Sequence, residues 1–170
     1  MIEAAEIMER GEAIRRLADS LAGKPVVWGP DGDDCCQLPL QWVVSWRERM
    51  TGICPDVEAP AYDNREEAHA IIDAAGGLAK VWEPICGQLG LEPLGPADIP
   101  IVGDVGIMRM STTEVGGIFL HGGLLLWRCD AERPEHRGFR TIDVVGRTFL
   151  RNDSLRGWQK FPVLVKAWQL

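Results

Sequence analysis

The stretch from Trp28 to Trp46 reads WGPDGDDCCQLPLQWVVSW and predicts an acidic, turn-rich loop that leads into an apolar helix. Asp34 is a preferred N-cap residue, because its carboxylate accepts a backbone N–H that the first helical turn leaves unpaired. Cys35 follows it, where the helix dipole and the free amides favour a negative charge. Pro39 cannot donate to the Cys35 carbonyl, so we expect a loosened or kinked first turn. The pattern is typical of an activated cysteine.

Length and composition indicate one ordinary globular domain over residues 1–170. Apolar residues make up 46% of the chain and charged residues 25%, as is typical of folded domains. The net charge of −7 and the absence of a basic cluster argue against a nucleic-acid partner. No apolar run approaches the roughly 20 residues that a membrane span needs. The acidic, amphipathic N-terminus does not resemble a signal sequence, so we expect a protein that is cytoplasmic at synthesis.

The cysteines do not predict a metal site. There are five of them, an odd number, and their spacing matches no zinc framework. We interpret Cys54, Cys86 and Cys129 as buried small hydrophobic residues, and Cys35 and Cys36 as different because they share the predicted helix start. The aspartates of the loop lack the glutamate-terminated pattern of a calcium loop, so we interpret them as turn and cap residues. The sequence predicts neither a metal nor a cofactor.

Apolar spacing and end signals predict a mostly helical half, residues 1–90. The four expected helices cover residues 2–22, 35–50, 64–76 and 78–89. Asp63 or Asn64 caps the third of them, and Glu67 would complete a capping box with Asn64. Pro84 is expected to interrupt the fourth.

Beyond a proline-punctuated linker at 91–100, the pattern changes to short strands separated by turn residues. A charged loop is expected at 132–140. Helices followed by an antiparallel sheet, over residues 100–170, make an α+β layout. The second helix should pack its apolar side, with Leu38, Val43 and Trp46, on this sheet. The expected strands are Val105–Met110, Val115–Leu120, Leu124–Cys129, Ile142–Val145, Thr148–Leu150 and Val163–Trp168.

Three elements together resemble the NlpC-type papain-like cysteine peptidases. They are W-G…D-C before a helix at 28–35, G-D-V-G-I-M from Gly103, and V-G-G-I-F-L-H-G-G from Val115. More particularly, the chain resembles a small family of tailed-phage and prophage proteins that keeps this skeleton, over roughly residues 25–130. The resemblance implies a papain-like fold in which N-terminal helices pack on a C-terminal antiparallel sheet.

Carried over residue by residue, the resemblance gives Cys35 the position of the nucleophile, with its own backbone N–H in the oxyanion hole. Asp104 matches a strand-opening acid with a structural role. The catalytic base is missing, because the alignment places Val115 where the family has its histidine, and valine cannot accept a proton. We expect Val115 to be the residue of 114–121 that lies nearest to Cys35.

Another histidine would have to replace the base. His121 lies on the same predicted strand and face as Val115, but six strand residues span about 20 Å, beyond hydrogen-bond reach. His69 on the third helix and His136 in the charged loop approach Cys35 only through an arrangement that the sequence does not specify. His121 is therefore a weak candidate for the base.

Two hypotheses of different class follow. In the first, the chain is a structural or assembly component of a phage or prophage tail, with a degenerate site, tail proteins as partners and a place in the virion. In the second, it is an active cysteine hydrolase whose ligands are peptidoglycan peptides, with Cys35 as nucleophile and a relocated base. The absent histidine favours the first, and the intact Asp34–Cys35 pair favours the second.

Overall fold

The computed structural model describes residues 2–170 except 96, 111, 132 and 145–162. In these described residues, four α-helices and a six-stranded sheet form an α+β structure, as the sequence predicted. The strand order is β1-β6-β2-β3-β4-β5, and every neighbouring pair is antiparallel. The elements are α1 (Ala4–Leu21), α2 (Leu38–Thr51), α3 (Arg65–Ala75), α4 (Leu78–Gln88), β1 (Glu92–Pro93), β2 (Val105–Met110), β3 (Thr113–Phe119), β4 (Leu124–Cys129), β5 (Gly138–Asp143) and β6 (Val163–Gln169).

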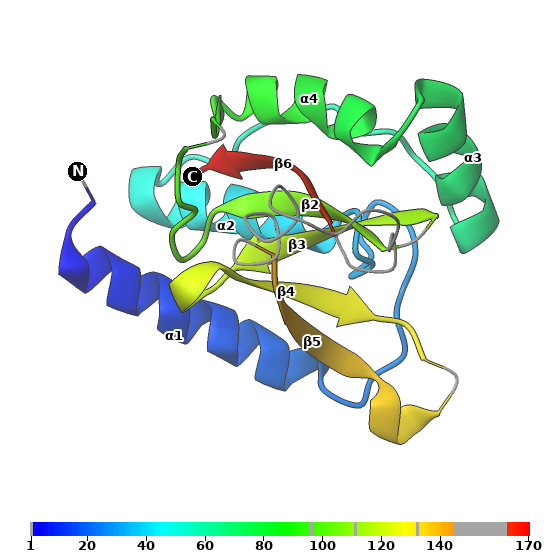
Figure 1. Cartoon of the computed structure of the whole chain (residues 1–170), viewed down its shortest axis with the longest axis horizontal. Coiled ribbons are helices and arrows are strands. Elements are labelled where there is room, and N and C mark those ends of the chain that lie inside the picture. Colours follow the sequence, from blue (N-terminus) through cyan, green and yellow to red (C-terminus); the bar gives the residue numbers. More distant parts are fainter. Residues whose placement is uncertain (1, 96, 111, 132, 145–162) are drawn as a thin grey trace, which may run out of the picture.

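The helices are arranged around the sheet (Figure 1). In this view α2 lies behind the sheet, and α3 and α4 lie above it. Val43 and Trp46 of α2 belong to one buried cluster with Ile107 of β2 and Ile118 of β3. This confirms that the apolar side of α2 packs on the sheet that contains β2 and β3. None of the helices in the described part of the chain is long and apolar enough to cross a membrane.

The other face of the sheet carries a second buried cluster. Among the described residues, its members include Met108, Val115, Phe119 and Leu125. Val144, which follows β5, also belongs to this cluster. Successive strand residues point to opposite faces, so β3 contributes Val115 and Phe119 here and Ile118 to the helical side. Cys35 packs against both clusters. Cys35, in the turn before α2, therefore contacts both buried clusters of the domain.

The strand predictions are confirmed for β2 and β4 and are close for β3 and β6. The expected strand at Ile142–Val145 is displaced, because β5 covers Gly138–Asp143 and uses part of the charged segment predicted as a loop. Pairing with β4 over the full strand explains this, since neighbouring backbone overrides local charge. The linker contains the short β1, which pairs with β6. The expected strand at Thr148–Leu150 lies outside the described residues.

Two helix predictions need correction. α2 begins at Leu38 and not at Cys35, so Pro39 occupies the first turn, where a missing N–H costs little. α4 continues through Pro84, since the helix is held by burial of Leu78, Trp82 and Ile85. The cap of α3 is confirmed, with Glu67 N–H donating to the Asn64 side chain at 2.9 Å.

Candidate functional site

The loop that carries the site is closed on itself. Asp33 N–H donates to the Val27 carbonyl at 2.8 Å, and Val27 N–H donates to Asp33 Oδ1 at 2.6 Å. Between them, Gly32 N–H donates to the Gly29 carbonyl at 2.8 Å. A Cβ on Gly32 would overlap the Val27 carbonyl oxygen, so the loop requires glycine there. These hydrogen bonds fix the backbone of the loop that leads to Asp34.

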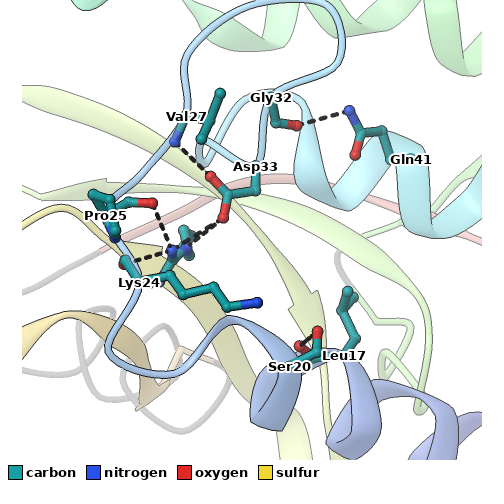
Figure 2. A network of polar contacts seen from close by, with 9 residues as sticks. Leu17, Ser20, Lys24, Pro25, Val27, Gly32, Asp33 and Gln41 are labelled. Carbon is teal, nitrogen blue, oxygen red and sulfur yellow. Dashed lines mark hydrogen bonds and ion pairs between the residues drawn. The ribbon is translucent and has the colours of Figure 1, made fainter.

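Long-range contacts anchor this loop to the sheet and to α2 (Figure 2). Arg128 of β4, buried, donates from Nη2 to Asp33 Oδ2 at 3.0 Å and to the Lys24 carbonyl at 2.9 Å. Gln41 of α2 donates from Nε2 to the Gly32 carbonyl at 2.7 Å. Asp33 is thus a structural ion-pair partner, in agreement with its interpretation as a turn residue.

Asp34 is fully buried and organises the turn between the loop and α2. Its Oδ1 accepts N–H groups of Cys36 at 2.8 Å and Gln37 at 3.1 Å, and the Tyr62 hydroxyl donates to the carboxylate at 3.0 Å. Burial raises the pKa of Asp34 above its ordinary value of 3.8, although these hydrogen bonds act in the opposite direction. Asp34 therefore caps a single turn, residues 35–37, that precedes the helix.

Cys35 lies in this turn, half-buried, with its backbone held by β3. Its carbonyl accepts the N–H of Gly116 at 3.1 Å. In a regular helix that carbonyl would accept from position 39, and Pro39 has no N–H to give. The Cys35 N–H has no hydrogen-bond partner among the residues that the structure describes. A free amide on the nucleophile residue is a donor available to an oxyanion.

The vicinal cysteines differ in environment. Cys36 is buried, and the pKa of its thiol lies well above the ordinary value because of the adjacent Cys35 side chain and of burial. Cys36 and Tyr62 line an apolar cavity of about 20 Å³ between α2, α3 and α4, with room for one water molecule. Cys35 does not line this cavity. Of the pair, Cys35 alone has the exposure that a nucleophile needs.

The other cysteines fall into two groups. Cys86 and Cys129 are buried, as the sequence predicted, and burial raises the pKa of Cys86 to about 12. Cys54 is exposed, in the loop between α2 and α3, so its interpretation as a buried hydrophobic residue is wrong. Among the described residues, no three His, Cys, Asp or Glu side chains gather closely enough to hold a metal ion.

The three histidines are all described, and none of them is hydrogen-bonded to Cys35. His121 is not on a strand, because β3 ends at Phe119 and His121 begins an exposed 3-10 turn before β4. His136 lies exposed in a second such turn. His69 on α3 contacts the ring of Trp28, with 6.5 Å between the ring centroids.

The register at the base position differs slightly from expectation. In the described segment 114–121, the hydrogen bond to Cys35 comes from Gly116, one residue after Val115. The Val115 side chain, 7% exposed, belongs to a cluster against which Cys35 packs. An apolar side chain therefore occupies this side of the cysteine.

Two residues of the site were missed by sequence reasoning. Gly116 holds the Cys35 carbonyl, and Pro39 was the available signal, since a carbonyl that no helical N–H can reach needs another donor. Tyr62 hydrogen-bonds Asp34 across 28 residues, and no local pattern indicates it.

Comparison with protein-family models, with curated proteins and with solved structures found no match.

Proposed function

We propose that this chain is a papain-like module of a phage or prophage tail, acting as a structural or assembly component with a degenerate cysteine site. One observation supports the proposal: none of the three histidines is hydrogen-bonded to Cys35, and the cysteine packs against the buried cluster that contains the apolar Val115. Among the described residues, the site therefore has a nucleophile, Cys35, but no histidine hydrogen-bonded to it as a general acid or base.

The missing group decides the chemistry. Cleavage of an amide by cysteine needs a thiolate, donors for the oxyanion and an acid that protonates the leaving amine. The turn at Cys35 offers a partly exposed sulfur as nucleophile and a free backbone N–H as an oxyanion donor. General acid–base catalysis is typically worth about 10²–10⁴ in rate. Without that factor, we expect peptide hydrolysis to be too slow to measure above a control that lacks the thiol.

The role of Asp104 supports the papain-like part of the proposal. The resemblance implies a structural acid at the start of the first core strand. Asp104 is buried directly before β2, and it accepts N–H groups of Ile101 at 2.8 Å and Leu170 at 2.9 Å. Both carboxylate oxygens of Asp104 therefore hold backbone N–H groups, which is a structural role.

The first experiment measures hydrolysis of peptidoglycan peptides by the purified chain, with Cys35→Ser as the matched control. We expect no turnover above that of the control. Turnover that Cys35→Ser abolishes would contradict the degenerate site.

The second experiment addresses the tail. Mass spectrometry of purified tail particles from the phage or prophage that encodes the chain should detect it at a fixed copy number per particle. Absence from intact particles would contradict the assembly role, whatever the outcome of the hydrolysis assay.

An active hydrolase with a relocated base is the second candidate. The contact between Trp28 and His69 favours it, since it places an imidazole against the loop that leads to Cys35. In that case replacing His69 by Gln should abolish turnover as completely as Cys35→Ser does, and replacing the exposed His121 or His136 should not.

A further inference from the structure

The turn before α2 carries two adjacent thiols that differ in exposure. Cys35 is half-buried and Cys36 is buried, and both pack in the same buried cluster. The two side chains interact directly, since the Cys35 side chain is the largest cause of the raised pKa of the Cys36 thiol. An oxidant dissolved in water can therefore reach Cys35, and a second thiol lies beside the sulfur that it oxidises.

The peptide group between the two cysteines is held at both of its polar atoms. Its carbonyl, from Cys35, accepts the Gly116 N–H of β3 at 3.1 Å, and its N–H, from Cys36, donates to Asp34 Oδ1 at 2.8 Å. Consecutive Cα atoms lie about 3.8 Å apart, whereas the Cα atoms of bridged cysteines usually lie about 4.4–6.8 Å apart. A disulfide between these neighbours therefore needs the peptide group to turn, and at least one of the two hydrogen bonds then breaks.

We propose that Cys35 and Cys36 form a peroxide-sensitive switch, whose disulfide releases the turn before α2 from Gly116 or from Asp34. In the first step the Cys35 thiolate attacks an oxygen of hydrogen peroxide, the O–O bond breaks, and sulfenic acid and water form. In the second step the Cys36 sulfur bonds to the Cys35 sulfur, and the sulfenic hydroxyl leaves as water. Two thiols and one peroxide thus give one disulfide and two water molecules.

Two properties of the switch follow from this chemistry. A disulfide that lies outside the usual Cα separation is strained and easily reduced, so the change is reversible. A thiolate reacts with peroxide without a neighbouring histidine, so the inference goes beyond the proposed function and does not depend on the absence of a base.

Cys54 is the control within the chain. It is exposed, so peroxide reaches it at least as easily as it reaches Cys35. Its sequence neighbours are Ile53 and Pro55, so no adjacent thiol condenses with its sulfenic acid. A disulfide at the pair therefore reports the neighbouring thiol and not access alone.

The first measurement treats the reduced wild-type chain, at low concentration, with hydrogen peroxide and maps its peptides by mass spectrometry. We expect the peptide that carries Cys35 and Cys36 to lose two hydrogen atoms, and Cys54 to gain oxygen instead. Glutathione should then restore both thiols of the pair, although it reduces ordinary structural disulfides poorly. Cys36→Ala should leave Cys35 to progress to sulfinic acid, and Cys54→Ser should leave oxidation of the pair unchanged.

The second measurement follows hydrogen exchange of the Gly116 and Cys36 amides in the reduced and the oxidised chain. At least one of them should exchange about two- to tenfold faster after oxidation, the factor that one hydrogen bond usually contributes. The amide of Glu67, which the Asn64 side chain holds at the start of α3, is the control and should not change.

The wild-type chain decides the outcome even if a variant fails to fold. Oxidation of Cys54 without any disulfide at the pair would overturn the switch. A disulfide with unchanged exchange at both amides would overturn the release of the turn. Neither measurement involves peptide hydrolysis or tail particles, so failure of the switch is distinguishable from failure of the proposed function.

Discussion

At the scale of single residues, Asp34 shows how burial and hydrogen bonding compete. The backbone N–H groups of Cys36, Gln37 and Gly29 and the Tyr62 hydroxyl favour its ionised form. Burial from water is nevertheless the largest influence and raises the pKa of the carboxyl. The folded state therefore binds a proton more tightly at Asp34 than the unfolded state does. Its contribution to stability is full below pH 3.8 and is lost as pH rises through the raised folded pKa.

Replacing Asp34 by Asn tests this sign. The amide oxygen can still accept the N–H groups of Cys36 and Gln37, and the variant cannot ionise. The free energy of unfolding of the wild type, minus that of Asp34→Asn, should fall as pH rises from the acidic range to neutrality. Urea denaturation at a series of pH values measures it. A difference that grows with pH would mean that the folded pKa is lowered.

Val115 is the second residue that carries a prediction. If it occupies the base position, Val115→His should accelerate release of an acyl group from Cys35 by about 10²–10⁴, the usual value of general base catalysis. The variant should lose some stability, because an imidazole replaces a buried apolar side chain. Val115→Asn is the matched control, since it introduces polarity without a base. Equal release rates in the two folded variants would place the base position elsewhere.

At the scale of elements, β3 and the turn before α2 meet at Gly116. A Cβ there would lie 2.5 Å from the Cys35 carbonyl oxygen and would also overlap the buried ring of Trp82. Gly116→Ala should therefore lower the free energy of unfolding by about 1–3 kcal/mol, the usual cost of overpacking. It should also change the alkylation rate of Cys35, because the turn must move away from the strand.

Gly87 in α4 provides the control for Gly116. A Cβ at Gly87 meets nothing within 4 Å, so Gly87→Ala should be neutral or stabilising by up to about 1 kcal/mol. Chemical denaturation of both variants, with Cys35 alkylation followed in parallel, measures the comparison. Equal effects of the two substitutions would mean that β3 does not hold the cysteine turn.

At the scale of the whole molecule, Arg10 joins the first helix to the end of the last strand. It is 4% exposed, pairs with Glu6 at 2.7 Å, and donates to the carbonyls of Val102 at 3.3 Å and Leu170 at 3.2 Å. Its guanidinium lies 5.7 Å from the ring centroid of Trp46 in α2. One side chain therefore connects α1, α2, the segment before β2 and the residue after β6.

Arg10→Met keeps most of the apolar stem and removes these polar contacts. We expect the free energy of unfolding to fall by at least about 1.5–3 kcal/mol, the usual contribution of one hydrogen bond from a charged group. Arg16→Met is the control on the same helix. Its exposed pair with Glu12 should be worth no more than about 1 kcal/mol. Similar losses for both variants, measured by urea denaturation, would contradict a joining role for Arg10.

The sequence by itself determined the α+β layout, the strands β2 and β4, and the cap of α3. These features follow from side-chain periodicity and from contacts within a few residues, which any chain with this pattern makes. Local signals also identified Asp34 as a cap residue and Cys35 as the residue that follows it at the helix start. They placed the helix start three residues early, because a proline in a first helical turn and a proline that breaks a helix look alike in sequence.

The tertiary structure alone decided what surrounds the cysteine. Arg128 reaches Asp33 across 95 residues, Tyr62 reaches Asp34 across 28, and Gly116 takes the carbonyl that Pro39 leaves free. Each of these contacts forms because the fold brings segments that are distant in sequence close together. Burial then requires polar groups in those segments to be hydrogen-bonded. The secondary-structure propensity of a local segment does not specify which distant segments it will contact.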